Sequence, residues 1–196
     1  SDDEITIFDA LTYAGSRDTM SDFVDDPRVV FVEGDICDRQ AVASAIEGHH
    51  AILHFAAESH VDRSIDGSER FVTTNCVGTN TLCDLAGQME IERFVHVSTD
   101  ETYGSTTQGS FTEEDKLAPS SPYSASKAAS DLIAMGHHIT HGLPVTVTRS
   151  SNNYGPFQFP EKLIPLFVTN LLDGLQVPLY GDGTNIRDWI HVNDNC

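Results

Sequence analysis

Lysine is scarce in this sequence, which has only Lys116, Lys127 and Lys162 among its 196 residues. The 11 basic residues stand against 30 acidic ones, so the formal net charge is −19. A surface of this kind repels the phosphates of nucleic acids and of anionic lipids, and we expect neither as a partner. The composition fits a protein that works at high salt, with an ordinary acidic bacterial enzyme as the alternative.

Motifs built on cysteine and long apolar runs are also absent. The four cysteines, Cys37, Cys76, Cys83 and Cys196, form no C-x-x-C pair, so the sequence predicts neither a zinc site nor a redox motif. No apolar run approaches the length of a membrane span, and we expect no membrane partner. These features indicate a reduced, cytoplasmic protein without a metal.

Strand and helix patterns alternate along the first 150 residues. Short β-branched and aromatic runs predict strands, and apolar positions at helical spacing predict helices between them. This order indicates an α/β fold with a doubly wound, Rossmann-like, mostly parallel sheet. The predicted strands are 5–8, 29–32, 51–55, 93–98, 145–149 and 188–192, and the predicted helices are 40–47, 69–88 and 121–141.

The pattern becomes irregular after Ser150, where turn residues and prolines gather. We therefore predict a partial NAD-binding domain over 1–150 and the start of a smaller, nucleotide-sugar-binding region over 151–196. No linker separates the two. In doubly wound sheets, ligands bind beyond the carboxyl ends of the strands. The polar or small residues that follow predicted strands should therefore converge on one edge.

A glycine-rich turn of the form G-x-G-x-x-G or G-x-x-G-x-x-G does not occur anywhere in the chain. In a dinucleotide-binding fold this turn joins the first strand to a helix whose N-terminus faces the pyrophosphate. Asp9, at the end of the first visible strand, stands where the ribose-binding carboxylate of a second strand is expected. We therefore expect a fragment that lacks its first β-α unit.

Two short segments carry the residues that are best suited to catalysis. Tyr123 and Lys127 lie four positions apart in a predicted helix, which places an ammonium beside a phenol and favours the phenolate. Thr99, Asp100 and Glu101 supply a hydroxyl and two carboxylates directly after a strand. A Tyr/Lys pair can help to oxidise a sugar hydroxyl, and two additional carboxylates can help to remove water.

These segments resemble the extended short-chain dehydrogenase/reductases, and within them the nucleotide-sugar 4,6-dehydratases. A Tyr-x-x-x-Lys motif alone is weak, but the Thr-Asp-Glu triplet and the Ala-Ala-Glu-Ser-His segment make the resemblance specific. The matching stretches are 9–15, 34–38, 54–64, 99–101, 119–127, 151–156, 159–165 and 187–190.

The resemblance implies a lyase that converts a thymidine-diphosphate-linked glucose to its 4-keto-6-deoxy derivative, as in deoxysugar (rhamnose) biosynthesis, with NAD as a recycled cofactor. It implies that Tyr123 takes the C4 hydroxyl proton while Lys127 lowers the pKa of the phenol and holds the nicotinamide ribose. Thr99 would orient the reacting oxygen. Glu101 would remove the C5 proton, and a protonated Asp100 would deliver a proton to the departing C6 hydroxyl.

The resemblance also implies the binding residues and a homodimer formed through helices 69–88 and 121–141. An acidic residue at position 9 favours NAD over NADP. The implied NAD contacts are Asp9, Leu11, Thr12, Asp35, Ile36, Phe55, Ala56, Ala57, Thr74, Tyr123, Lys127 and Asn153. The implied substrate contacts are Ser59, Thr99, Asn152, Lys162, Leu163, Pro178, Tyr180 and Arg187.

Other functions remain open at this point. A nucleotide-sugar 4-epimerase needs the Tyr/Lys pair but no carboxylate pair, and a uridine-diphosphate sugar could replace the thymidine compound. A non-catalytic sugar-nucleotide-binding domain is a third possibility. Asp131 is interpreted as a capping or surface charge and His54 as a hydrogen-bonded core histidine. His137, His138 and His141 are interpreted as a solvated helix end rather than as metal ligands.

The charge of −19 leads to a first prediction, about salt. Salt screens the repulsion among surface carboxylates, so the melting temperature should rise with salt concentration. The rise should continue well above 0.1 M salt, where the Debye length is already about 10 Å. Thermal melts across a potassium chloride series up to molar concentration test this. A melting temperature that stays constant above roughly physiological salt would indicate an ordinary acidic protein without adaptation to salt.

Overall fold

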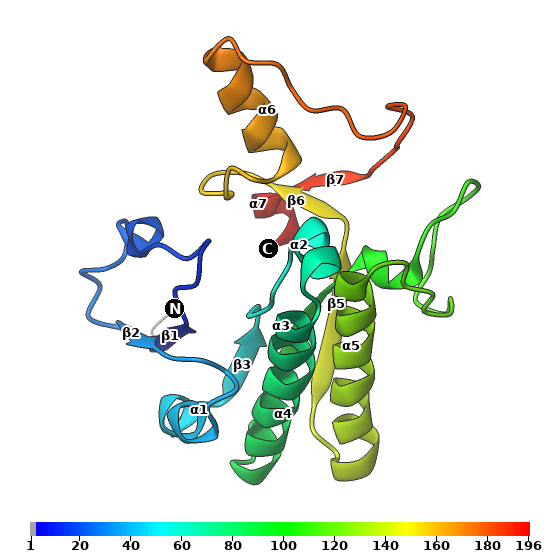
Figure 1. Cartoon of the computed structure of the whole chain (residues 1–196). Helices are drawn as coiled ribbons and strands as arrows, with labels where there is room; N and C mark the ends of the chain where they lie inside the picture. Colours follow the sequence, from blue (N-terminus) through cyan, green and yellow to red (C-terminus); the bar gives the residue numbers. More distant parts are fainter. Residues whose placement is uncertain (1–2) are drawn as a thin grey trace. The chain divides into compact units, whose positions relative to one another are not determined.

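A computed structural model describes residues 3–196 of the chain. The chain forms two compact units, Ser1–Arg149 and Ser150–Cys196. The elements of the first unit are β1 (Ile5–Asp9), β2 (Val29–Glu33), α1 (Arg39–Ile46), β3 (Ala51–His54), α2 (Val61–Asp66), α3 (Glu69–Phe71), α4 (Thr79–Gln88), β4 (Arg93–Thr99), α5 (Pro122–His141) and β5 (Val145–Ser150) (Figure 1). The second unit contains β6 (Asn152–Tyr154), α6 (Leu163–Leu172), β7 (Trp189–His191) and α7 (Val192–Asn195).

The strands form three small sheets. β1 pairs in parallel with β2, and a second sheet has the order β3-β4-β5, with β3 and β4 parallel. β6 pairs in parallel with β7. Crossover connections between parallel neighbours are the mark of an α/β fold, and the predicted fold class is confirmed. The predicted strands of the first unit each match an observed strand to within a residue or two.

The predicted helix over 69–88 is confirmed, but it is not uniform. It begins as α3, runs through a π-helical stretch over Val72–Gly78 and continues as α4. A π-helical stretch inside an α-helix is rare and turns side chains to a different face. Here it directs Asn75 and Thr79 into the interior, where both are buried.

The segment after Ser150 is more regular than the sequence predicts. The expectation of irregular structure there is wrong for 163–172, which form the apolar helix α6, and β6 and α7 were also not predicted. The prolines misled the prediction because Pro165 lies in the first turn of α6, where a missing N–H disrupts no helical hydrogen bond. In the first unit, helix α2 and a 3₁₀ turn over Arg17–Met20 were also not predicted from the sequence.

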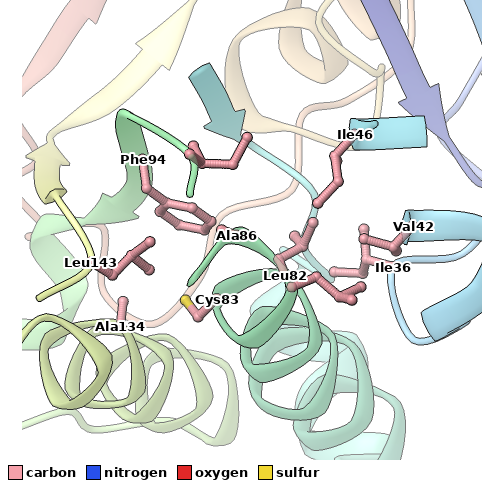
Figure 2. Close-up of a cluster of buried hydrophobic side chains, with 11 residues drawn as sticks. Ile36, Val42, Ile46, Leu82, Cys83, Ala86, Phe94, Ala134 and Leu143 are labelled. Atoms are coloured by element: carbon pink, nitrogen blue, oxygen red, sulfur yellow. The ribbon is translucent and has the colours of Figure 1, made fainter. Parts of the chain in front are cut away.

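The main hydrophobic core lies where α1, α4 and α5 meet strand β4 (Figure 2). α4 and α5 pack against each other along their length (Figure 1). Phe94 of β4 is fully buried and lies near Leu143 and Ala86 in this cluster (Figure 2). The buried members are Ile36, Val42, Ile46, Leu82, Cys83, Leu85, Ala86, Ile91, Phe94, Ala134 and Leu143.

Substitution of two helical glycines by alanine should change the free energy of unfolding in opposite directions. A Cβ on Gly78 would overlap the side chain of Ile36, which is buried in the core, whereas a Cβ on Gly136 of α5 would meet nothing within 4 Å. Alanine improves helix propensity at both positions by about 1 kcal/mol, but overpacking at Gly78 costs about 1–3 kcal/mol. We expect Gly136→Ala to stabilise the protein and Gly78→Ala to destabilise it.

Urea denaturation of the two variants and the parent measures both free energies of unfolding. Each variant serves as the control for the other, because the chemical change is identical. A Gly78→Ala protein that is as stable as Gly136→Ala would show that Ile36 can move aside freely, contrary to the packing described.

Candidate active site

A cleft of about 310 Å³ opens at the carboxyl ends of β1, β2 and β3. It contains seven of the residues that the sequence predicts as cofactor contacts, although they come from four separate segments: Asp9, Thr12, Asp35, Ile36, Ala56, Ala57 and Thr74. The other five predicted contacts are not among the lining residues: Leu11, Phe55, Tyr123, Lys127 and Asn153. The lining also includes Glu58, Glu69, Arg70 and Thr73, which were not predicted. The structure therefore brings most of this predicted set to one place.

The turn after β1 is fixed by the carboxylate of Asp9. Its Oδ1 accepts a hydrogen bond from the backbone N–H of Leu11 at 2.7 Å. Leu11 has a φ of 44°, a left-handed conformation that is uncommon for a leucine. Backbone strain of this kind is concentrated at functional sites, and the residues on either side of Leu11, Ala10 and Thr12, line the cleft.

The turn after β2 is built in a similar way. Oδ1 of Asp35 accepts from the backbone N–H of Cys37 at 2.8 Å, which closes the loop between β2 and α1. Gly34 precedes it, and a Cβ at that position would lie 2.5 Å from the ring of Phe8. The two strand ends therefore carry an aspartate each and approach closely because position 34 has no side chain.

The Thr99-Asp100-Glu101 triplet follows β4 directly. Thr99 is the last residue of the strand, and its Oγ1 accepts from the backbone N–H of Glu101 at 3.2 Å. This hydrogen bond begins a 3₁₀ turn over Asp100–Tyr103. The turn ends at Gly104, whose φ of 87° suits glycine. Both carboxylates are thus held in a short, capped turn at the end of a central strand.

Helix α5 places Tyr123 and Lys127 on its buried side. The helix begins with a capping box, in which Ser121 and Ser124 each accept from the other's backbone N–H at 3.0 Å. Pro122 occupies the first turn, as is typical of helix N-termini. Tyr123 is 9% exposed and Lys127 is 4% exposed. The prediction that the pair shares one helix is confirmed.

The expected effect of Lys127 on Tyr123 is wrong for the protein without ligands. Burial raises the pKa of the Tyr123 phenol, and the carboxylates of Glu101 and Asp100 raise it further, while a hydrogen bond with Thr99 acts in the opposite direction. Lys127 is not among the main influences on this pKa, and its ammonium donates to the backbone oxygen of Val97 at 2.8 Å. The 3₁₀ turn that carries Asp100 and Glu101 packs against α5, so the acid pair and the phenol lie in neighbouring elements.

Asn75 is a buried polar residue that the sequence analysis missed. Its side-chain oxygen accepts from the backbone N–H of Glu58 at 2.8 Å, and its nitrogen donates to the Glu58 carbonyl and to Ser126 Oγ. Ser126 lies on α5 between Tyr123 and Lys127. Asn75 therefore joins the cleft-lining segment at Glu58 to the helix that carries the Tyr/Lys pair. No local pattern marks it, since its role depends on the π-helical stretch.

The interpretation of Asp131 as a capping or surface charge is wrong. Asp131 is 1% exposed and lies one turn beyond Lys127 on α5. Its Oδ2 accepts from Arg149 Nε at 2.8 Å, and its Oδ1 lies 3.2 Å from His96 Nε2. Arg149 also donates to the hydroxyl of Tyr103 at 2.8 Å. This buried chain reaches from α5 to the turn that carries Asp100 and Glu101.

The remaining predicted contacts, apart from Ser59, lie in the second unit. Asn152 and Asn153 belong to β6, and Asn152 donates to the backbone oxygen of Asp188 next to β7. Lys162 precedes α6 and Leu163 is its first residue. Pro178, Tyr180 and Arg187 lie in the connection between α6 and β7, where Tyr180 is exposed.

Neither a cluster of metal-binding side chains nor a membrane-length apolar helix occurs in residues 3–196. Within them, no group of three or more His, Cys, Asp or Glu side chains is placed to hold a metal ion. His54 is buried and its Nε2 lies 2.9 Å from Thr79 Oγ1, so its interpretation as a hydrogen-bonded core histidine is confirmed. No helix in the described part of the chain combines the length and apolarity needed to cross a bilayer.

A parallel α/β sheet, an acidic turn and a Tyr/Lys helix together define the class of short-chain dehydrogenase/reductase-like proteins. A model of the family described as GDP-mannose 4,6 dehydratase matches residues 3–196, and the chain belongs to this family. The chain resembles a dTDP-glucose 4,6-dehydratase from Actinoplanes sp., with 57% identity over 98% of the chain and 60% of that protein.

Two other similarities are informative. The chain is 54% identical to the low-salt glycan biosynthesis protein Agl12 of Haloferax volcanii, over 100% of the chain and 63% of that protein. The crystal structure of DesIV, a dTDP-glucose 4,6-dehydratase from Streptomyces venezuelae solved with NAD bound, superposes with a TM-score of 0.98 at 57% identity. The match covers 100% of the chain and 61% of DesIV. The chain thus spans about three fifths of the length of these relatives.

His54, close to Lys127, leads to a prediction about pH. Burial lowers its pKa well below the ordinary 6.5, so the folded protein keeps it neutral while the unfolded chain protonates it. The unfolded state then binds more protons, and this contribution to stability is present above pH 6.5 and is lost as the pH falls below it. His54→Gln lacks the titration. We expect the stability of the parent relative to this variant to fall by about 1.4 kcal/mol per pH unit below that value.

Denaturation of parent and variant at several pH values from neutral to mildly acidic gives the difference. His141→Gln is the matched control, because it makes the same chemical change at an exposed position at the end of α5. If the His54→Gln difference did not change with pH, the folded and unfolded states would take up the His54 proton equally, contrary to the lowered pKa.

Proposed function

We propose that the complete protein containing this chain is an NAD-dependent nucleotide-sugar 4,6-dehydratase that acts on dTDP-glucose. The observation that carries the proposal is the meeting of a carboxylate pair with a buried Tyr/Lys pair. The turn that carries Asp100 and Glu101 packs against α5, and both carboxylates contribute to the raised pKa of the Tyr123 phenol. The relatives named dTDP-glucose 4,6-dehydratase, 57% identical to the chain, support the same reaction.

The residues of the cleft fit the adenosine end of NAD. Asp9 ends β1 and Asp35 follows the end of the neighbouring strand β2, so both carboxylates lie in the cleft lining, as recognition of a free ribose hydroxyl requires. Ile36 and the small Ala56 and Ala57 leave apolar space between them. Thr12 and Thr74 add hydroxyl groups. We propose that these seven residues, with Leu11, Phe55 and Asn153, hold the cofactor, and that Tyr123 and Lys127 contact its nicotinamide ribose.

When bound, NAD would supply a positively charged ring as the acceptor for the C4 hydride, which is the hydride that the sugar regains at C6 after water is lost. The rest of the chemistry belongs to the side chains. Tyr123 takes the proton of the C4 hydroxyl, and Thr99 orients the reacting oxygen. The burial that raises the pKa of Tyr123 makes a nearby positive charge necessary, since a phenol with this pKa is a poor source of phenolate at neutral pH.

The carboxylates act after C4 has become a ketone, which acidifies the C5 proton. Glu101 removes that proton, and Asp100 delivers a proton to the C6 hydroxyl as it departs as water. The capped turn keeps the two acids at fixed positions relative to Tyr123, which is a requirement of a reaction with two proton transfers. A 4-epimerase performs neither step and would leave both carboxylates without a role.

The second unit supplies the proposed sugar-nucleotide contacts. Lys162 and Arg187 are cations in a chain that has few, and a diphosphate needs such groups. We propose that they act with Ser59, Thr99, Asn152, Leu163, Pro178 and Tyr180. Parallel assays with dTDP-glucose and UDP-glucose distinguish the two nucleotides.

We also propose a cytoplasmic homodimer adapted to high salt. The exposed apolar residues Val72 and Val77 on the long helix, and Leu132 and Ile139 on α5, support pairing through these helices. The charge of −19 supports the adaptation to salt.

Variants of the two proposed catalytic pairs test the order of the steps. Glu101→Gln should still oxidise C4 but stall before water is lost, so bound NADH accumulates and product formation falls about 10²–10⁴-fold. Tyr123→Phe should block the first hydride transfer, so no NADH signal appears. Rapid mixing of the NAD-loaded complete protein with dTDP-glucose, followed by NADH absorbance, measures both effects.

Glu92→Gln is the matched control for charge, because Glu92 is exposed and directly precedes β4, at the end opposite the acidic turn. It should behave as the parent. If Glu101→Gln dehydrated the substrate at the normal rate, Glu101 would not be the C5 base. Absence of dehydration by the parent on either nucleotide sugar would overturn the proposed function itself.

A further inference from the structure

Lys127 carries a charge in a place that disfavours it. Its ammonium is almost fully buried and donates to a neutral acceptor, the backbone oxygen of Val97. An ammonium removed from water is costly unless an anion compensates it. Burial accordingly lowers the pKa of Lys127 from 10.5 to about 8, and Asp131 is the largest influence that raises it. The charge of Lys127 at neutral pH is therefore finely balanced.

The ionisable groups facing Lys127 come from three further elements. Cys76, from the π-helical stretch, has a pKa raised by burial, so its thiol is protonated at neutral pH. His54 of β3 and His96 of β4 have pKa values lowered by burial, so both rings are neutral there. Of the groups that raise the pKa of Lys127, only Asp131 bears a negative charge at neutral pH.

Asp131 itself is kept ionised by its partners. Burial alone would raise its pKa, but contacts from His96, Ser98 and Arg149 outweigh burial and lower it. The Arg149 hydrogen bond at 2.8 Å is charge-assisted, and such bonds are roughly twice as strong as neutral ones. Ser130 also orients the ring of His96. Its Oγ donates to the Lys127 carbonyl, so it can accept a hydrogen bond from His96 Nε2, which lies 3.0 Å away.

The geometry points to Asp131 as a positioning residue that acts through Lys127. We propose that its carboxylate, which accepts a hydrogen bond from Arg149 at Oδ2 and lies 3.2 Å from His96 Nε2 at Oδ1, keeps the Lys127 side chain in the ammonium form one helical turn beyond Tyr123. Arg149 neutralises only part of this carboxylate, because the guanidinium is partly open to solvent and is shared with Tyr103. This inference rests on the proposed function only for the catalytic role of the charged Lys127. The effect of Asp131 on that charge does not depend on it.

The test is a direct titration of Lys127 by NMR of protein labelled at the lysine ε-carbon. Lys116 and Lys162, the other lysines of the chain, serve as internal references. The signal of Lys127 is assigned by its loss in Lys127→Met. In the parent we expect Lys127 to titrate near pH 8. In Asp131→Asn we expect this value to fall by about 1–3 units, while the references stay unchanged.

Three matched variants separate charge from packing. Asp131→Glu keeps the charge and should titrate close to the parent. Tyr103→Phe removes a hydroxyl from the same buried chain but leaves Asp131, and should leave Lys127 unchanged. Asp84→Asn removes a carboxylate that pairs with Arg39 near the surface, and controls for the net charge. Circular dichroism confirms that each variant is folded.

An unchanged titration of Lys127 in folded Asp131→Asn overturns the proposal. If that variant does not fold, the parent decides: a Lys127 that is already uncharged at neutral pH overturns the proposal, and one that is charged there supports it. The measurement needs neither NAD nor a sugar nucleotide. Its result is therefore independent of whether the complete protein proves to be a dehydratase.

Discussion

The burial of charged groups along one side of α5 is the constraint on which the rest of the site depends. The helix must bring Tyr123 and Lys127 against the end of β4, and the same face then carries Asp131 into the interior. Each buried charge has to be compensated locally, because effective screening inside a protein is weak. Arg149 from β5, His96 from β4 and the backbone of Val97 provide this compensation. The position of α5 is thereby coupled to both strands by polar contacts as well as by apolar packing.

The sequence is most informative where structure is determined locally. The strands at 5–8 and 29–32 and the long helix 69–88 carry strong patterns, and all three form as predicted. Residues that follow strand ends are forced to a common edge by parallel pairing. For this reason Asp9, Asp35 and Ala56, far apart in the sequence, could be assigned to one cleft before the structure was known.

The features that the sequence analysis missed all depend on tertiary partners. Asp131 looks like any other acid of a chain with 30 of them, and only the packing of α5 against β4 and β5 shows that it is buried. The raised pKa of Tyr123 reflects burial and two carboxylates from another element, neither of which the Tyr-x-x-x-Lys spacing reveals. Asn75 is directed inward by a π-helical stretch that has no simple sequence signal. Local pattern gives the position of these residues but not their electrostatic surroundings.

The acidic surface and the buried cations belong to one electrostatic system. At low salt, a net charge of −19 produces a diffuse negative potential that favours protonation throughout the molecule, and thus favours the ammonium of Lys127. High salt screens distant surface charges, since the Debye length falls to about 3 Å at 1 M, but it screens a buried pair much less. The contribution of Asp131 therefore becomes the dominant one as the salt concentration rises. With this surface, a close internal anion is what keeps the proposed catalytic lysine charged when the external field is screened.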